Sequence, residues 1–279
     1  MKEDFNSLQR SLTEHYDPQE AQGMMKLLAM HYLGITSLQW FTKDFGDVET
    51  ERYQELVVAV DRLLQNEPLQ YIVGEADFYG FTFHVSPSVL IPRPETEELI
   101  EWILTTTEDG KKILDIGTGS GCIPITLKKH LPKSLLSAID YSLDAIKVAK
   151  QNAELLQVDV EFLEDNALAL SQDMIDRKWD VIVSNPPYIR TLEKDEMRDN
   201  VLLHEPDMAL FVSNDDPLIF YREIGKYGIS NLNDGGTLFF EINQYLGEEM
   251  VSLLNDLGYR EVTLRKDLSG NDRMVRAVK

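Results

Sequence analysis

The feature that most constrains the fold is a short apolar run that stops at two prolines. Residues 181–183 are Val-Ile-Val, a β-branched run that favours a buried strand. Pro186 and Pro187 carry no backbone N–H and cannot continue a central strand. The strand therefore brings Asn185 to its carboxyl end, which is where open α/β sheets bind their ligands.

Mostly hydrogen-bond acceptors remain at this strand end. They are the side-chain oxygen of Asn185 and the backbone carbonyls of Asn185 and Pro186. An NH2 group has two donors to satisfy, so this pocket suits a planar nitrogen, and we expect Tyr188 to lie against a planar amide or a base. The candidate catalytic residues are therefore Asn185, Pro186, Pro187 and Tyr188.

From Lys111 onward the pattern alternates between strands and helices, which indicates a parallel sheet. The apolar run is the fourth strand of this sheet. The other expected strands cover residues 113–116, 135–139, 158–163 and 236–242, and a terminal hairpin covers 262–264 and 274–278.

The residues before the sheet predict a helical region and a hairpin. Apolar residues recur at helical spacing over 21–30 and 56–64, and Asp17-Pro18 is a suitable start for the first of these helices. The methionines of the first set are interpreted as core residues, with a partner-binding face as the alternative. Alternating aromatic residues over 78–85 predict a β-hairpin that turns near Gly80.

A glycine-rich loop directly follows the first expected strand. Its residues are Gly117, Thr118, Gly119, Ser120 and Gly121. Glycines let a backbone turn tightly and approach a ligand closely. The loop lacks the third glycine of the dinucleotide fingerprint at its usual spacing. The negative charge of Asp115 would repel a pyrophosphate but would attract a cationic amino-acid moiety. Between a dinucleotide and S-adenosyl-L-methionine, the loop therefore favours S-adenosyl-L-methionine.

Two further strand ends supply candidate cofactor contacts. Asp140 ends the second strand, a position where an acid accepts hydrogen bonds from a ribose diol. Asp165 and Asn166 follow the third strand and form a polar pair suited to an adenine edge. Cys122 is interpreted as a packing residue, because no His or second Cys adjoins it. No metal site is expected.

The bulk charge argues against a nucleic-acid partner. The chain carries 27 Lys+Arg against 48 Asp+Glu, a net charge of −21, whereas proteins that grip phosphates normally carry a basic patch. Only a local basic cleft would offset this charge, and the acidity also fits solubility or a basic protein partner. One cysteine, no apolar signal region at the start and no membrane-spanning stretch favour a cytoplasmic protein without membrane contact.

Taken together, these motifs resemble the release-factor glutamine N5-methyltransferases of the PrmC/HemK type over nearly the whole chain. Asn-Pro-Pro-Tyr also occurs in adenine-N6 methyltransferases, so it indicates only methyl transfer to a planar nitrogen. The block Ile-Pro-Arg-Pro-Glu-Thr-Glu at residues 91–97 is more specific and separates the two families. The other matching stretches are residues 67–74, 78–80, 89–90, 115–121, 184–189, 205–210 and 267–270.

The resemblance implies an α/β fold with a seven-stranded Rossmann-like class I methyltransferase domain. Residues 1–72 would form a small all-α substrate-recognition domain, 73–90 a β-hairpin linker and 91–279 the S-adenosylmethionine-dependent methyltransferase domain. The implied substrate is the glutamine of a Gly-Gly-Gln motif in peptide-chain release factors. The implied products are N5-methylglutamine and S-adenosyl-L-homocysteine, and the protein is expected to be a monomer.

The resemblance also implies roles for particular residues. Residues 117–121 and Asp140 match its cofactor positions, and Asn185 to Tyr188 match its substrate loop, with Asn185 expected near the cofactor as well. The chain departs from the family pattern in three places. Asn166 stands where an aromatic residue is common, Ser88 where glycine is frequent, and Asn243 where glycine is usual.

Several roles stay open at this point. His204 and Glu205 are the nearest candidates for a proton acceptor, but a loop that closes the site is the preferred interpretation. Arg93, Glu95 and Thr96 would shape the cofactor or substrate entrance, or serve a purely structural role. The competing functions are an adenine-N6 nucleic-acid methyltransferase and a non-catalytic adaptor.

Overall fold

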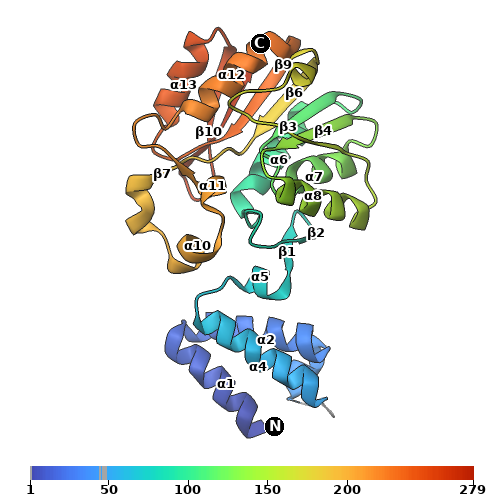
Figure 1. Ribbon diagram of the computed structural model, residues 1–279, viewed down its shortest axis with the longest axis vertical. Coiled ribbons are helices and arrows are strands. Elements are labelled where there is room, and N and C mark those ends of the chain that lie inside the picture. The colour runs from blue at the N-terminus through green and yellow to red at the C-terminus, as the bar shows by residue number, and fades with distance from the viewer. Residues whose placement is uncertain (1, 44, 46–48) are drawn as a thin grey trace. The chain divides into compact units, whose positions relative to one another are not determined.

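The computed structural model describes residues 2–43, 45 and 49–279. The chain forms two compact units (Figure 1). The first consists of Met1–Gly74 and Arg198–His204, and the second of Glu75–Met197 and Glu205–Lys279.

The first unit is helical, as the sequence predicts. The helix α2 begins at Pro18, where Asp17 accepts a hydrogen bond from the Gln19 N–H. It ends at Leu33 and is capped by Gly34, whose φ is 66°. Met25 is fully buried in the core of this unit, so the interpretation of the methionines as core residues is confirmed at that position. The helices are α1 (Lys2–His15), α2 (Pro18–Leu33), α3 (Ser37–Thr42), α4 (Thr50–Leu64), α5 (Leu69–Val73) and α10 (Asp199–His204).

The second unit begins with the predicted hairpin. Strands β1 (Glu75–Phe78) and β2 (Phe81–His84) pair antiparallel. Tyr79 and Gly80 form the turn with φ values of 50° and 77°. A helix, α6 (Pro94–Thr106), follows, with Pro94 in its first turn.

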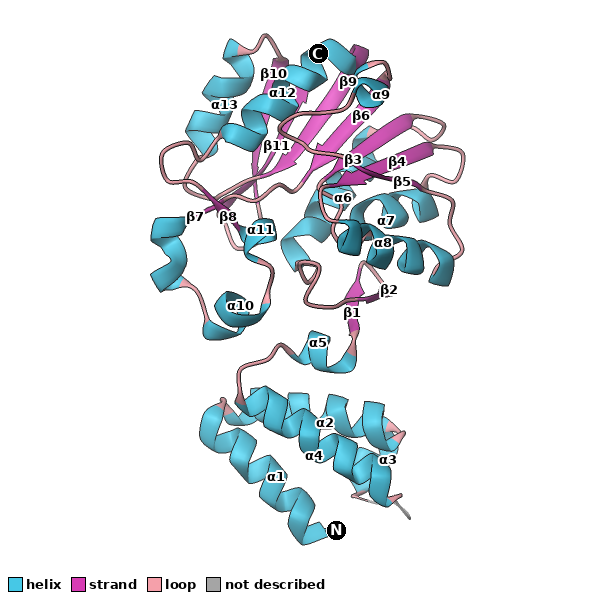
Figure 2. Ribbon diagram, in the orientation of Figure 1, coloured by secondary structure: helices cyan, strands magenta, loops and turns pink. Residues whose placement is uncertain are grey.

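The main sheet has seven strands in the order β10-β11-β9-β6-β3-β4-β5 (Figure 2). Strands β9, β6, β3, β4 and β5 are parallel, whereas β11 runs antiparallel to both β9 and β10. The bounds are β3 (Lys112–Ile116), β4 (Leu135–Asp140), β5 (Glu161–Glu164), β6 (Trp179–Ser184), β9 (Leu232–Glu241), β10 (Arg260–Lys266) and β11 (Asp272–Val278).

Helices cover both faces of this sheet. One face packs against α6, α7 and α8, and the other against α9, α12 and α13 (Figure 2). Along β6, Val181 and Val183 enter the first of these cores and Ile182 the second, so the strand is buried on both faces as its β-branched run predicts. These helices are α7 (Cys122–His130), α8 (Leu143–Leu155), α9 (Gln172–Ile175), α12 (Ile219–Asn231) and α13 (Gly247–Asp256).

The structure differs from the sequence prediction in a few local features. The third predicted strand begins at Glu161 instead of residue 158, because residues 158–160 lie outside the ladder with β4. The segment after the two prolines holds small elements that have no clear periodicity. These are β7 (Ile189–Arg190), the 3-10 helix η1 (Thr191–Glu196), α11 (Asp207–Leu210) and β8 (Phe211–Val212).

Strand order determines where a ligand binds. The chain continues from β3 to β4 on one side, while β6 pairs with the other side of β3, so the order reverses at β3. Open α/β sheets bind ligands outside the carboxyl ends of the strands at such a reversal. In the register, Ile116 at the end of β3 lies beside Ser184 at the end of β6.

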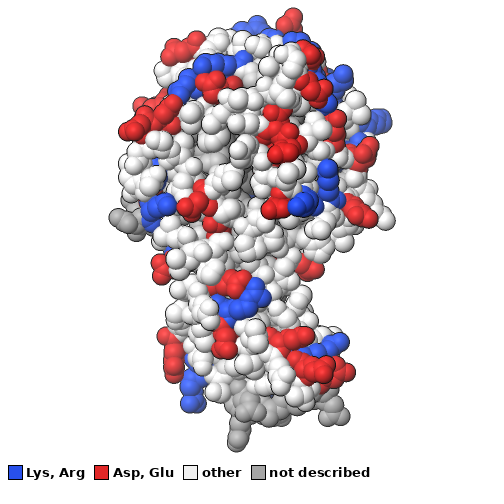
Figure 3. All heavy atoms as spheres, in the orientation of Figure 1, with Lys and Arg blue, Asp and Glu red and all other residues white. Residues whose placement is uncertain are grey.

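The lengths of the helices and the surface charge both bear on function. Within the described residues no helix is both long and apolar enough to cross a membrane. On the face drawn in Figure 3, basic side chains are interspersed with acidic ones.

Candidate active site

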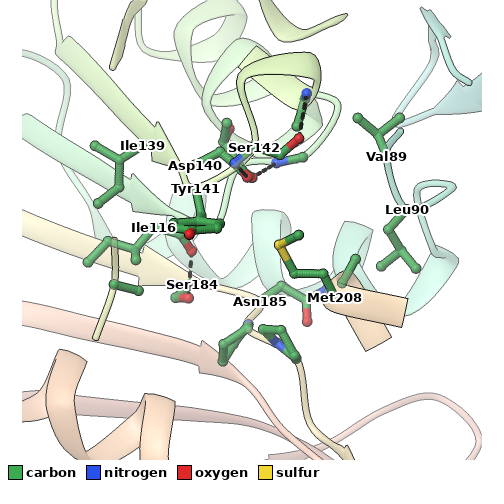
Figure 4. A pocket seen from close by; sticks show the side chains of 18 of the residues that line it. Val89, Leu90, Ile116, Ile139, Asp140, Tyr141, Ser142, Ser184, Asn185 and Met208 are labelled. Carbon is green, nitrogen blue, oxygen red and sulfur yellow. Dashed lines mark hydrogen bonds between the residues drawn. The ribbon is translucent and has the colours of Figure 1, made fainter. Parts of the chain in front are cut away.

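A cavity of about 360 Å³ lies at the carboxyl ends of β3, β4, β5 and β6 (Figure 4). Its walls come from the glycine-rich loop, the residues after β4 and β5, and the residues after β6. Further lining comes from residues 88–96, with the start of α6, and from residues 206–209, with α11. The start of α7 and residues Phe220 and Ile224 of α12 also line the cavity. All of these belong to the second unit.

The glycine-rich loop serves two purposes. Gly117, Thr118, Gly119 and Ser120 line the cavity. No described atom lies within 4 Å of a Cβ built on Gly117 or Gly119, so both positions face open space. A Cβ on Gly121 would instead lie 3.0 Å from Ile125 Cδ1 and 3.1 Å from Ala149 Cβ. Gly121 therefore serves the packing of α7 against α8, and its contact with the cofactor stays a prediction.

Asp115 lies near the end of β3, just before this loop, with a fully buried carboxylate. The residue is 0% exposed, and among the described residues neither carboxylate oxygen has a hydrogen-bond partner. Burial, with a smaller contribution from the negative charge of Asp140, raises the pKa of Asp115 to about 7, although the nearby hydroxyl of Thr118 lowers it. The hydroxyl of Thr118 is likewise buried without a partner in the described part of the chain. Buried polar groups of this kind need a donor from a ligand or from water.

Asp140 is held in place by backbone donors. Its Oδ2 accepts a hydrogen bond of 2.9 Å from the Gly119 N–H, and its Oδ1 accepts one of 2.9 Å from the Ser142 N–H. Burial raises the pKa of Asp140. Each carboxylate oxygen can accept more than one hydrogen bond, so Asp140 retains acceptor capacity at the cavity wall where Figure 4 shows it.

Asp165 and Asn166 line the cavity, but their side chains also organise the loop after β5. Asp165 accepts hydrogen bonds from the Ser171 hydroxyl at 2.6 Å and from the Asn166 N–H at 2.7 Å. Asn166 Oδ1 accepts one of 2.9 Å from the Leu168 N–H. Part of the acceptor capacity of this pair is therefore used within the protein, and its contact with an adenine edge stays a prediction.

The end of β6 presents Asn185 to the cavity. Ser184 donates a hydrogen bond of 2.6 Å to the Ile116 carbonyl and so joins the ends of β6 and β3. Asn185, Pro186 and Pro187 line the cavity. Asn185 Nδ2 donates to the Thr96 hydroxyl at 3.3 Å. Figure 4 shows Asn185 across the cavity from Asp140, beside Met208 of α11.

Tyr188 lies differently from the sequence-based expectation. Its hydroxyl donates to Glu241 Oε1 at 3.1 Å, so the side chain is directed at Glu241 instead of lining the cavity. Burial and the negative charge of Glu241 raise the pKa of Tyr188. The physical reason is the buried carboxylate at the end of β9, which needs hydrogen-bond donors. Its pairing with Tyr188 was not visible in the sequence.

A clamp joins the two segments that line the mouth of the cavity. Arg93 Nη2 donates to Glu205 Oε1 at 2.6 Å, and the Ile91 N–H donates to Glu205 Oε2 at 3.3 Å. Glu205 thus acts as a structural link, which agrees with its interpretation as part of a loop that closes the site. His204 belongs to the first unit, where its ring nitrogen lies 3.2 Å from the Gln65 carbonyl oxygen.

Sequence reasoning assigned no role to two polar residues of this region. Glu241 receives hydrogen bonds from Thr96 and Tyr188, and Asn243 Nδ2 donates to the Tyr188 carbonyl at 3.0 Å. The sequence signal for Glu241 was a charged residue directly after the apolar run Leu-Phe-Phe at a strand end.

Cys122 is buried, and burial raises the pKa of its thiol to about 12, so it remains a neutral thiol at pH 7.

Comparison with known proteins gives consistent matches for both units. The PrmC N-terminal domain family matches residues 5–74, and the methyltransferase small domain family matches residues 95–211. A release factor glutamine methyltransferase of Flavobacterium psychrophilum is 50% identical over 220 residues, covering 77% of this chain and 76% of that protein. One of Bacteroides thetaiotaomicron is 42% identical over 270 residues, covering 97% of each.

Solved structures show the same fold at low sequence identity. A methyltransferase of Pyrococcus furiosus has a TM-score of 0.56 at 16% identity and covers 83% of this chain and 99% of its own. A 16S rRNA methyltransferase of T. thermophilus, solved with AdoMet and guanosine, has a TM-score of 0.54 at 19% identity. It covers 74% of this chain and 49% of its own.

Proposed function

This chain belongs to the release factor glutamine methyltransferase family, and we propose that it methylates a glutamine side chain of peptide-chain release factors in this cavity. The methyl donor is S-adenosyl-L-methionine, and the products are N5-methylglutamine and S-adenosyl-L-homocysteine. The predicted Rossmann-like class I methyltransferase fold is confirmed by the seven-stranded sheet and by its structural relatives. The observation that carries the proposal is an amide, Asn185, facing a cavity whose opposite wall is lined by Asp140 and the glycine-rich loop.

The residues around the cavity fit S-adenosyl-L-methionine. The carboxylate of Asp115, fully buried two residues before the cavity-lining Gly117, suits the ammonium of its amino-acid moiety. Asp140 supplies acceptors for a ribose diol, and the apolar side chains of Ile116 and Ile139 line the cavity nearby. Bound here, the sulfonium supplies a methyl group that is already activated for transfer.

The chain's own residues then bind and orient the acceptor nitrogen. An amide nitrogen is a weak nucleophile because its lone pair is shared with the carbonyl. In the proposed mechanism Asn185 Oδ1 and the Pro186 carbonyl accept its two N–H bonds, which draws electron density toward nitrogen and fixes its direction. Alignment of this kind is worth roughly 7–11 kcal/mol in favourable cases. Proton loss after methyl transfer removes the need for a strong general base.

We further propose roles for the parts of the chain. The helical unit of residues 1–74 recognises the release factor, the hairpin is the linker, and the sheet unit performs the chemistry. The protein acts as a cytoplasmic monomer. In the sequence-based assignment the domains divide at residues 72 and 90, whereas compactness divides the chain at Gly74 and adds Arg198–His204 to the helical unit.

Two other functions compete with this proposal. An adenine-N6 nucleic-acid methyltransferase needs a basic groove, which is difficult to reconcile with a net charge of −21 and the interspersed charges of Figure 3. A non-catalytic adaptor needs none of the polar groups that face the cavity.

The test is incubation with isotopically labelled S-adenosyl-L-methionine and either a release factor or DNA, followed by mass spectrometry. We expect label on the glutamine of the Gly-Gly-Gln peptide. The Asn185→Ala variant should bind the cofactor with affinity near that of the wild type and lose most methyl transfer. Label on adenine, or no label on either substrate, would refute the proposal.

A further inference from the structure

A single buried carboxylate connects both polar side chains of the Asn-Pro-Pro-Tyr loop. Glu241 is 1% exposed at the end of β9. Its Oε2 accepts a hydrogen bond of 2.6 Å from the Thr96 hydroxyl, and its Oε1 accepts one of 3.1 Å from the Tyr188 hydroxyl. Thr96 in turn accepts from Asn185 Nδ2 at 3.3 Å. A continuous path therefore runs from Glu241 through Thr96 to Asn185.

Glu241 is in an environment that favours its role as an acceptor. Each of its oxygens receives a hydroxyl donor. Burial raises the pKa of Glu241, while the hydrogen bond from Thr96 and the positive charge of Arg273 oppose that rise. Even a carboxyl group with its proton on Oε1 would leave Oε2 as a bare acceptor toward Thr96.

The number of protons on each group determines which group donates in each hydrogen bond of this path. When Glu241 is ionised, or carries its proton on Oε1, its Oε2 has no proton to give, so the Thr96 hydroxyl donates to it, as the structure has it. A hydroxyl has only one proton, so Thr96 can meet Asn185 only as an acceptor. The atom of Asn185 that faces Thr96 must therefore be nitrogen, as the structure has it.

We propose that Thr96 and Glu241 are positioning residues that fix the flip of the Asn185 amide, so that its oxygen and not its NH2 group meets the methyl acceptor. This inference rests on the proposed function, because the acceptor is taken to be an NH2 group. With the opposite flip, two donor groups would face each other across the reacting centre. Thr96 and Glu241 thereby set the acceptor character of the pocket without touching the substrate nitrogen.

The same contacts give the block around residues 91–97 a physical meaning. Thr96 lies in the first turn of α6, and Glu241 lies 145 residues later at the end of β9. The hydroxyl of Thr96 is the only group of that first turn that joins Glu241 to Asn185 among the described hydrogen bonds. A threonine or serine is therefore required at this position for the relay.

The test compares Thr96→Val, which keeps the side-chain shape and removes the hydroxyl, with Thr96→Ser, which restores the hydroxyl. Loss of one preorganised hydrogen-bonding group in an active site costs roughly 10²–10³ in kcat. Since Thr96 acts through Asn185, we expect kcat for Thr96→Val to fall by at least about tenfold. KM for the release factor and Kd for S-adenosyl-L-methionine should change less than kcat, and Thr96→Ser should recover most of the rate.

Two controls separate positioning from general damage. Thr126→Val removes another fully buried threonine hydroxyl, on α7, that has no hydrogen-bond partner in the described part of the chain. It should leave kcat near the wild-type value. In an Asn185→Ala background, Thr96→Val should have little further effect, because the residue through which it acts is gone.

The outcomes distinguish this inference from the proposed function. If the wild-type protein does not methylate the glutamine, the proposed function is refuted and the inference with it. If the wild type is active but Thr96→Val retains its kcat, only the inference is refuted. An equal loss of kcat from Thr96→Val in the wild-type and Asn185→Ala backgrounds would also overturn it.

Discussion

Ser184 donates a buried hydrogen bond of 2.6 Å to the carbonyl oxygen of Ile116, and this contact joins the carboxyl ends of β6 and β3. The residue after Ser184 is Asn185, and the residue after Ile116 is Gly117. Together with the ladder between β3 and β6, this hydroxyl holds the spacing between the proposed substrate loop and the proposed cofactor loop. The position of the methyl acceptor relative to the donor depends on that spacing.

Ser184→Ala should therefore affect catalysis more than binding. We expect a loss of stability of about 1–2 kcal/mol, because the removed hydrogen bond is buried. A fall in kcat should accompany it, with Kd for S-adenosyl-L-methionine nearly unchanged. Urea unfolding and steady-state kinetics measure both effects. Ser137→Ala on β4 is the matched control, because its buried hydroxyl bonds to Glu161 away from the cavity. If the two variants have equal kcat, Ser184 does not set the spacing.

Substitutions of Gly119 and Gly121 should have different effects, because the two glycines have different surroundings. The Cβ of an alanine at position 121 would lie 3.0 Å from Ile125 Cδ1 and 3.1 Å from Ala149 Cβ. The Cβ of an alanine at position 119 would have no described atom within 4 Å. Both positions have positive φ, a strain of roughly 1–2 kcal/mol for a residue with a Cβ. Gly121→Ala should therefore lose more stability in urea unfolding, and Gly119→Ala should lose more affinity for S-adenosyl-L-methionine in calorimetry. The reverse order would contradict the division of roles.

The clamp between Arg93 and Glu205 offers a third test. The Glu205 side chain is 1% exposed, so Arg93→Met leaves a buried carboxylate without its cation. Breaking a buried pair in this way typically costs about 3–5 kcal/mol, and less is expected here because Arg93 is 30% exposed. The double variant Arg93→Met, Glu205→Gln should recover part of the stability, as thermal unfolding would show. If the double variant is less stable than Arg93→Met alone, the clamp is not the cause.

The sequence predicted the sheet well because strand signals are local. The β-branched run at 181–183 is apolar on both faces, and β6 is buried on both faces. Two prolines then limit where that strand can end, so the location of Asn185 at a strand end followed directly. The start of β5 was placed too early, since Val158 and Val160 are apolar at period two yet lie outside the ladder.

The interior of the site was harder to predict because its contacts join distant residues. Glu241 and Thr96 are separated by 145 residues, and only the packing of α6 against β9 brings them together. Tyr188 follows the prolines in sequence, but the buried carboxylate of Glu241 draws its hydroxyl away from the cavity. Gly121 belongs to the glycine motif, yet its neighbours are helices. Motif membership therefore did not specify which atoms face the ligand.

The buried carboxylate of Asp115 makes a prediction about pH. Burial raises its pKa from 3.8 to about 7 in the folded protein, so the folded state holds a proton that the unfolded state has lost. Stability of the ligand-free protein should therefore fall as pH rises from about 4 to about 7. At about 1.36 kcal/mol per pKa unit, the change from 3.8 to about 7 corresponds to as much as about 4 kcal/mol.

Asp115→Asn removes the titrating group and tests this directly. Measured by urea unfolding without ligand, the stability of the variant relative to the wild type should increase between pH 5 and pH 8. At pH 8 the same variant should bind S-adenosyl-L-methionine more weakly, since the ammonium loses its counter-charge. Wild-type affinity should in turn weaken below pH 7, where Asp115 takes up its proton, and the variant should show less of this dependence. A stability difference that does not change with pH would show that Asp115 is not the buried titrating group.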